Sequence, residues 1–244
     1  MTAFLFDLDG TLHDSVPVIC HVSQLAYAEL GLERSLEEIK KTIGVPLVKT
    51  GEELFGPGNG DLYRLTYQRI YQEQESLFPL RAFPGIPEML SALRERGARL
   101  AVVTSKRHQL TLENLETTGL LPLVEVVVDA QSTDKHKPDP EPALLALKQL
   151  GCLPEQQSCL PEQRSCLPEQ QSCLPEQGVF IGDSLFDLGC GRNAGLKTVA
   201  VSWGAGIRQE LADFQPDFLC DTVEELQQVL LSLQEASSCP EEQR

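Results

Sequence analysis

The sequence has few basic residues for its length. Its 244 residues include 20 Lys and Arg against 36 Asp and Glu, which gives a formal net charge of −16. Broad binding to nucleic acid or to an anionic membrane surface needs a basic surface. The composition therefore argues against nucleic-acid and membrane partners. It leaves room for a local basic pocket that binds a small anionic substrate.

Long hydrophobic runs are also lacking. No apolar stretch approaches the ~20 residues that span a bilayer. The chain begins MTAFLFDLDG, with acids where a signal peptide would continue its apolar stretch. We therefore expect a cytoplasmic protein.

Cysteines are present but do not form the framework of a small secreted domain. Four of the eight are scattered, at Cys20, Cys190, Cys220 and Cys239, and reduced thiols are expected. The other four belong to a unit, Cys-Leu-Pro-Glu-Gln-Xaa-Ser, that runs through almost four copies over Cys152–Gln177.

This repeat has features that oppose regular structure. A proline in every unit argues against a helix, and the spacing lacks the C-x₂₋₄-C pairs of zinc sites. One copy is enough to link the preceding helix to the next strand, so the others resemble a tandem duplication. We expect a loop insertion that points away from the functional site, and whether it has another role stays open.

Short apolar runs alternate with helical patterns along most of the chain. Strands are expected at Ala3–Phe6, Arg99–Val103, Val124–Val128, Val179–Ile181, Thr198–Ser202 and Phe218–Cys220. This alternation predicts a parallel sheet with helices on both faces. Residues 16–80 show helical patterns and no convincing strand. The prediction is a doubly wound α/β core of residues 1–15 and 81–244, with a small all-helical domain of residues 16–80 inserted after the first strand.

Two acids end the first predicted strand. Asp7 and Asp9, at i and i+2, project to the same side, and Gly10 lets the backbone turn sharply and approach a ligand. Paired carboxylates can bind a hard divalent cation and divide nucleophilic and acid–base work. An isolated Asp-x-Asp is equally typical of a turn.

Other strand ends carry polar residues. Thr104 and Ser105 precede a helix, where a hydroxyl is either a simple cap or part of an anion site. Lys137, in a proline-rich turn, is a candidate point charge facing the same cleft. Asp183 ends a strand and Asp187 lies one helical turn later, so both can face one centre. The same sequence would also fit Asp183 as a simple helix cap and Asp187 as a surface acid. Carboxyl ends of parallel strands gather at one edge, which is where ligands bind in such sheets.

In this order, these residues resemble the four motifs of the haloacid dehalogenase-like hydrolases. The matching segments are FDLDGT at Phe6–Thr11, VTS at Val103–Ser105, Lys137-Pro138 and GDSLFD at Gly182–Asp187. The resemblance covers essentially the whole chain apart from the repeat. It implies a Rossmann-like core and identifies the helical insert as similar to the small cap of this family.

The resemblance also implies a mechanism. Asp7 would be the nucleophile that forms an aspartyl-phosphate, and Asp9 would be the acid that protonates the leaving alcohol and then the base that activates water. Thr104 and Lys137 would hold the phosphoryl oxygens, and Ser105 and Gly10 would contribute to substrate binding.

A metal site is implied as well. Asp183, Asp7 and the main-chain carbonyl of Asp9 would hold Mg²⁺, with Asp187 acting from nearby or through water. Asp14 and Ser15 match the hinge from which the cap departs in this family.

Weaker similarities concern the branch of the family. Ile43–Leu47, Phe83–Gly85 and Lys137–Pro142 resemble the phosphoglycolate phosphatases and pyrophosphatases. A β-phosphoglucomutase relative would have an arginine near Leu47, which this chain lacks. A phosphatase for a small phosphorylated metabolite is favoured, with an inorganic pyrophosphatase or a sugar-phosphate mutase as alternatives. Lys49 and the Gly44–Leu47 turn are candidate substrate contacts. The physiological substrate, and whether the protein is a monomer or a homodimer, stay open.

Two non-enzymatic alternatives remain. A signalling receiver domain also phosphorylates an aspartate on a doubly wound sheet, but it would lack the helical insert and the second acid pair. A binding module without activity is disfavoured because the acids and Lys137 are intact. The sequence favours an enzyme, a phosphoric monoester hydrolase.

Overall fold

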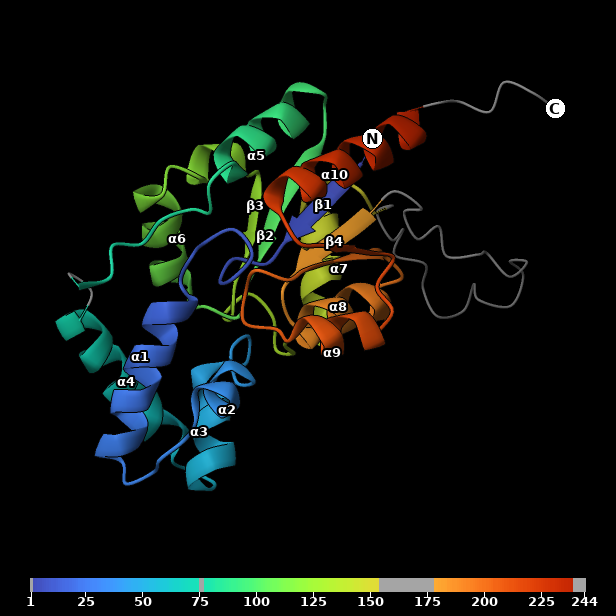
Figure 1. The fold of residues 1–244 in the computed structure, drawn as a ribbon. Helices are drawn as coiled ribbons and strands as arrows, with labels where there is room; N and C mark the ends of the chain where they lie inside the picture. The colour runs from blue at the N-terminus through green and yellow to red at the C-terminus, as the bar shows by residue number, and fades with distance from the viewer. Residues whose placement is uncertain (1, 75–76, 154–177, 239–244) are drawn as a thin grey trace, which may run out of the picture.

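The computed structural model describes residues 2–74, 77–153 and 178–238 (Figure 1). The predicted repeat loop lies outside the described residues from position 154 onward. The strands are β1 (Ala3–Phe6), β2 (Arg99–Val103), β3 (Val126–Val128), β4 (Gly178–Gly182), β5 (Lys197–Val201) and β6 (Phe218–Cys220). The helices after β1 and before β2 are α1 (Val16–Glu29), α2 (Leu36–Lys40), α3 (Leu47–Phe55), α4 (Gly60–Gln74) and α5 (Ile86–Glu95). Those that follow are α6 (His108–Thr117), α7 (Glu141–Gln149), α8 (Leu185–Asn193), α9 (Arg208–Asp213) and α10 (Val223–Ser238).

The six strands form one parallel sheet in the order β3-β2-β1-β4-β5-β6. This is the predicted doubly wound α/β architecture, with β1 near the middle. Three predicted strands differ in their bounds: β4 is one residue longer at each end, β5 begins and ends one residue earlier, and β3 begins at Val126 rather than at Val124. The preceding Leu121–Leu123 forms a 3₁₀ turn that ends at Val124, so this valine completes the turn instead of joining the sheet.

Helices cover both faces of the sheet, and β1 shows why its four residues are all apolar. Phe4 and Phe6 pack into the core beneath α5 and α10, whereas Ala3 and Leu5 pack against α7 on the other side (Figure 1). Side chains of a strand alternate between its faces, so a strand covered on both sides reads as a continuous hydrophobic run.

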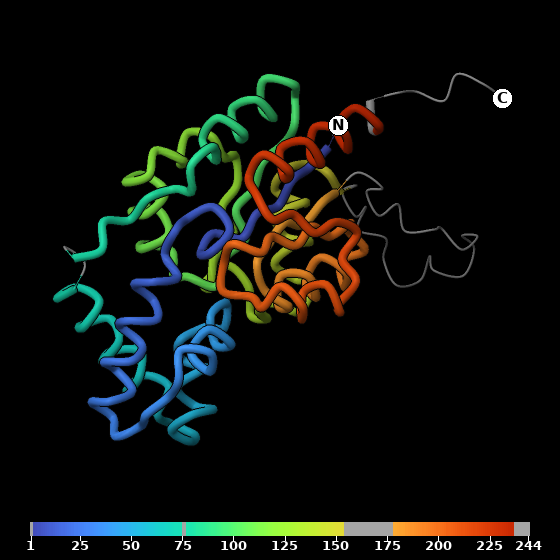
Figure 2. Tube along the Cα trace, viewed as in Figure 1, coloured from blue at the N-terminus to red at the C-terminus, as the bar shows by residue number. Residues whose placement is uncertain are grey.

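Helices α1 to α4 form a separate helical unit beside the carboxyl edge of the sheet (Figures 1 and 2). They enclose their own apolar cluster, which includes Tyr27, Ile39 and Tyr63. A capping box at Ser35 and Glu38 begins α2. Packing of α3 on α4 is close, because a Cβ on Gly60 would lie only 2.5 Å from the Val48 carbonyl oxygen.

Two neighbouring chain segments join this helical unit to the sheet (Figure 2). The Asp14 amide donates to the Arg81 carbonyl at 2.9 Å, and the Phe83 amide donates to the Leu12 carbonyl at 3.0 Å. The chain therefore leaves the core and returns to it at adjacent points. None of the helices in the described ranges is long and apolar enough to cross a membrane.

Candidate active site

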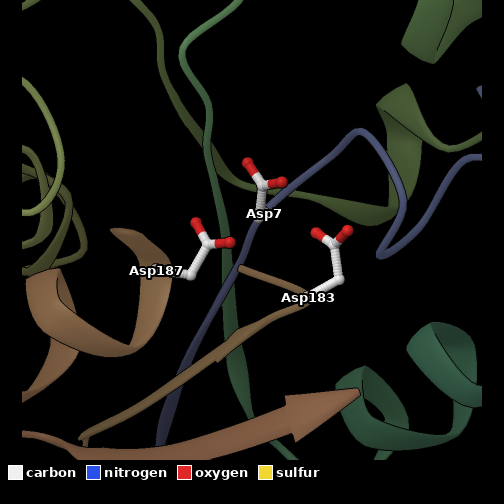
Figure 3. A group of neighbouring side chains, drawn as sticks. All are labelled: Asp7, Asp183 and Asp187. Carbon is white, nitrogen blue, oxygen red and sulfur yellow. The ribbon is translucent and has the colours of Figure 1, made fainter. Parts of the chain in front are cut away.

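Three predicted acids meet at the carboxyl edge of the sheet. Asp7 follows β1, Asp183 follows β4, and Asp187 lies in the first turn of α8; Figure 3 shows their carboxyl groups near one another and extending in the same general direction. One oxygen from each lies within 4.8 Å of the others, and all three residues are buried. We call these three residues the acid cluster.

The start of α8 fixes the orientation of Asp187. Ser184 is the N-cap, and its amide and hydroxyl donate to Asp187 Oδ2 at 3.1 and 2.6 Å. Because Oδ2 is occupied by the cap, Oδ1 is the oxygen that faces the acid cluster. Asp187 is thus both a capping residue and a site residue.

Lys137 provides a positive charge inside the acid cluster. Its Nζ donates to Asp7 Oδ1 and Asp187 Oδ1, both at 2.6 Å, and to the Val103 carbonyl at 3.2 Å. An ammonium group has three N–H donors, so each donor has an acceptor. Burial alone would lower the pKa of Lys137, but the carboxylates of Asp187 and Asp7 raise it above its ordinary value, and the lysine stays charged.

Negative charge nevertheless exceeds positive charge here. Burial raises the pKa of Asp183 to about 7, with a further contribution from Asp187. Burial and then the Asp187 carboxylate likewise raise the pKa of Asp7 well above its usual range, against the opposing effect of Lys137. Three carboxylates face one ammonium, so the cluster can accept a divalent cation, and oxygen donors are the ligands that hard cations prefer.

The backbone around Asp183 is arranged for close approach. Asp183 accepts a hydrogen bond from the Thr11 hydroxyl at 3.2 Å and one from the Ala205 amide at 2.6 Å. Gly10 has φ +79°, and a Cβ there would lie 2.4 Å from Asp183 Oδ2. The predicted sharp turn at Gly10 is confirmed, and the absence of a side chain makes room for the carboxylate; its contact with substrate stays a prediction.

The raised pKa values predict an unusual dependence of stability on pH. Without metal, the acid cluster holds more protons in the folded protein than in the unfolded chain between about pH 4 and pH 7, because Asp183 titrates near 7 when folded and near 3.9 when unfolded, and the pKa of Asp7 is also raised. His13, with a pKa of about 4 when folded and about 6.5 when unfolded, acts in the opposite direction and offsets part of this excess. The free energy of unfolding should fall as pH rises through this window, by at most about 1.4 kcal/mol per unit of pKa shift.

Urea unfolding of metal-free protein at pH 5 and pH 8 checks this expectation. Added Mg²⁺ should recover most of the stability lost at pH 8, since the cation takes the place of the protons. Greater stability at pH 8 than at pH 5 without metal would contradict the charge balance given above.

Thr104 and Ser105 lie at the carboxyl end of β2, at the same edge of the sheet. The Thr104 amide pairs with the Val128 carbonyl at 2.9 Å, and its hydroxyl accepts a hydrogen bond from the Lys106 amide at 3.2 Å. Thr104 is buried and Ser105 is half-buried. Their predicted contacts with phosphoryl oxygens require a ligand and stay predictions.

Asp9 lies outside the acid cluster and has different partners. Its Oδ1 accepts hydrogen bonds from the Ser15 hydroxyl at 2.6 Å and from Lys106 Nζ at 2.8 Å. Burial would raise the pKa of Asp9, but the Lys106 ammonium outweighs it and holds this pKa below its ordinary value. Burial and Lys106 also lower the pKa of His13 to about 4, so this neighbouring ring is neutral.

Lys106 was missed in the sequence. The available signal was a cation two residues after Thr104, in the loop at the end of a strand. A lysine in such a loop is usually solvated, and only the structure reveals its ion pair with Asp9.

The predicted substrate contact Lys49 is not supported by its position. It lies on α3 with 57% of its side chain exposed, and its Nζ is 4.0 Å from Glu53. The nearby Ile43–Leu47 turn does reach the core, because a Cβ on Gly44 would lie 3.4 Å from the Ser184 hydroxyl oxygen. This turn, more than Lys49, adjoins the site, although a role for either in substrate binding stays a prediction.

Family comparisons agree with this geometry. A family model described as haloacid dehalogenase-like hydrolase matches residues 4–159, and a second, HAD-hydrolase-like model matches residues 136–226. Pyrophosphatase PpaX of Listeria monocytogenes is 29% identical over 228 residues, covering 93% of this chain and 94% of the relative. Phosphoglycolate phosphatase of Nitrosospira multiformis is 32% identical over 233 residues, covering 91% and 92%.

Solved structures show the same fold. A predicted phosphatase from Clostridium acetobutylicum superposes with a TM-score of 0.76 at 21% identity, covering 95% of this chain and 98% of that one. A putative phosphoglycolate phosphatase from Lactobacillus plantarum superposes with a TM-score of 0.73 at 25% identity, covering 96% and 100%.

Proposed function

This chain belongs to the haloacid dehalogenase-like hydrolases, and we propose that it is a Mg²⁺-dependent phosphatase that hydrolyses a small phosphate monoester through an aspartyl-phosphate on Asp7. The observation that carries the proposal is the acid cluster with Lys137 bound to Asp7 at 2.6 Å. Relatives named phosphoglycolate phosphatase and pyrophosphatase support the reaction class.

The proposed reaction has two steps. A carboxylate oxygen of Asp7 attacks phosphorus, the bond from phosphorus to the leaving oxygen breaks, and Asp9 gives that oxygen a proton. This step requires the protonated form of Asp9, which Lys106 disfavours in the ligand-free protein. Asp9 then takes a proton from water, which attacks the phosphoryl group and releases Asp7 and inorganic phosphate. Lys137 and Thr104 hold the phosphoryl oxygens, for which Lys137 exchanges one of the three acceptors that it has in the ligand-free protein. Ser105 and Gly10 are the remaining candidate contacts.

A divalent cation fits the acid cluster by its donor chemistry and by its excess negative charge. We assign Mg²⁺ to Asp7, Asp183 and the main-chain carbonyl of Asp9, with Asp187 nearby. When bound, Mg²⁺ would neutralise charge on the phosphoryl group, so that an anionic nucleophile can approach it.

The helical unit is the proposed cap of the site. In this assignment residues 16–80 form the cap, and residues 1–15 and 81–244 form the catalytic core. Asp14 and Ser15 lie in the connecting segment, where the Asp14 amide pairs with Arg81. The cap would exclude water that competes with the leaving group.

Metal removal gives a direct test. Wild-type protein should release phosphate from at least one of a panel of phosphoglycolate, sugar phosphates, nucleotides and pyrophosphate when Mg²⁺ is present. EDTA should abolish the release, and Mg²⁺ should raise the midpoint of thermal unfolding because it binds the folded state. Equal turnover in EDTA and in Mg²⁺ would contradict the assignment.

Pyrophosphate hydrolysis is the second candidate. Its support is the 29% identity to the Listeria monocytogenes pyrophosphatase over most of both chains. The ratio of kcat/KM for phosphoglycolate and pyrophosphate in the same panel separates the two candidates. A cytoplasmic location and a sugar-phosphate mutase activity stay predictions from the sequence.

A further inference from the structure

Lys106 is a buried cation that the mechanism above does not use. Its main chain is fixed at the end of β2, since its amide donates to Thr104 Oγ1 at 3.2 Å and its carbonyl accepts from the Ala130 amide at 3.0 Å. Only 11% of its side chain is exposed, and its Nζ lies 2.8 Å from Asp9 Oδ1. The ammonium group is therefore held beside the proposed acid, on the leaving-group side of the site.

A second anchor holds Lys106 independently of Asp9. Asn114, on α6, is buried. With its side-chain nitrogen donating to the Leu110 carbonyl at 3.2 Å, its amide oxygen accepts from Lys106 Nζ at 2.7 Å. Asn114 in this orientation gives the ammonium a partner besides Asp9.

These contacts leave the Lys106 ammonium and the Asp9 carboxyl group each with a position for a ligand. Two of the three Lys106 N–H donors have acceptors in the part of the chain that the structure describes. Both hydrogen bonds to the Asp9 carboxyl group, from Ser15 and from Lys106, end on Oδ1. Oδ2 of Asp9 is thus the oxygen that remains to contact the leaving oxygen of a substrate. A group one or two bonds beyond the leaving oxygen would then come within reach of the third Lys106 donor.

From this arrangement we propose that Lys106 is the specificity-determining residue of the site: it binds a negative charge carried by the leaving group. The inference rests on the proposed phosphatase reaction. Suitable substrates have a carboxylate or a second phosphate close to the scissile oxygen, and neutral polyol esters lack this contact. Among the residues that the structure describes, Lys106 alone forms an ion pair with Asp9, so the leaving-group side depends on its charge.

A pair of non-hydrolysable ligands tests the proposal without turnover. 3-Phosphonopropionate carries a carboxylate, and 3-hydroxypropylphosphonate replaces it with a neutral hydroxyl on a chain of the same length. In the presence of Mg²⁺, calorimetry should find that wild-type protein binds the carboxylate ligand on the order of 10- to 100-fold more tightly, as for a hydrogen bond to a charged group.

Substitutions then assign the preference to one side chain. Lys106→Met should remove the preference, Lys106→Arg should retain part of it, and Asn114→Leu should weaken it by loosening the ammonium. Lys197→Met is the matched control, since Lys197 is exposed at the amino end of β5, and it should bind both ligands as the wild type does. Thermal unfolding of each variant confirms that it is folded.

Two outcomes overturn the proposal: a wild-type protein without preference for the carboxylate ligand, or a Lys106→Met variant in which affinity for both ligands falls equally. The latter would mean that Lys106 acts only through Asp9. Phosphate release from phosphoglycolate by wild-type protein is measured alongside. If phosphoglycolate and every other member of the substrate panel fail to release phosphate while the binding preference is present and is lost in Lys106→Met, the phosphatase function is wrong and the assignment of Lys106 as an anion contact stands.

Discussion

Asp7→Asn is expected to lower kcat for phosphate release by at least about 10³-fold, as the loss of a nucleophile does in other covalent mechanisms. The amide cannot attack phosphorus, whereas it nearly keeps the size of the carboxyl group and still offers an oxygen to Lys137. Steady-state phosphate release with Mg²⁺ gives the size of the effect. Trapping of a phosphorylated protein by acid quench, followed by mass measurement, should detect the adduct in wild type and not in the variant.

Asp213→Asn serves as the matched control, because Asp213 is an exposed acid at the end of α9, away from the acid cluster. It should retain wild-type turnover. Metal-free Asp7→Asn should unfold at a temperature equal to or above that of the wild type, since one of three mutually repelling carboxylates is removed. Unchanged turnover in Asp7→Asn would exclude Asp7 as the nucleophile.

Of the proposed substitutions, Lys137→Met is expected to lower the free energy of unfolding most. The variant leaves Asp7, Asp183 and Asp187 buried with no ammonium among them, and breaking a buried ion pair on one side costs about 3–5 kcal/mol. Urea unfolding of metal-free protein at pH 8 measures the loss. Phosphate release should also fall, because the phosphoryl oxygens lose their cation.

The pH dependence of this loss identifies its cause. At pH 5 more of the acid cluster is protonated, so the difference between Lys137→Met and wild type should shrink. Lys148→Met, at an exposed position of α7, should change stability little at either pH. A loss of the same size at pH 5 and pH 8 would point to lost packing and not to unbalanced charge.

Much of the fold follows from local sequence patterns. The apolar run of β1 predicts a strand covered on both faces, and the acids after β1 and β4 predict a shared edge because the strands are parallel. Strand pairing then brings Asp7 and Asp183 together across 176 positions of sequence, in the register that places Ala3 beside Gly178. Asp187 follows because α8 begins directly after β4.

Contacts between loops could not be predicted in the same way. The ion pair of Lys106 with Asp9 depends on how the loop after β2 lies against α6, and no periodicity encodes that path. The Ala205 amide reaches Asp183 from the loop after β5 for a similar reason. Lys49 is the opposite case, since a cation close in sequence to the Ile43–Leu47 turn lies on the exposed surface of α3, and its contact with substrate stays a prediction.

The hydrogen bond between the Asp14 amide and the Arg81 carbonyl has an evolutionary consequence. The residues between Asp14 and Arg81 leave the core and rejoin it at two points that one hydrogen bond connects. This segment can therefore lengthen, shrink or be exchanged without moving the strand ends that hold Asp7 and Asp183. In the proposed assignment, the catalytic acids and the cap are thereby encoded by separate stretches of the chain. Lys106, which lies after β2 and not in the inserted helices, would place one element of substrate choice in the core itself.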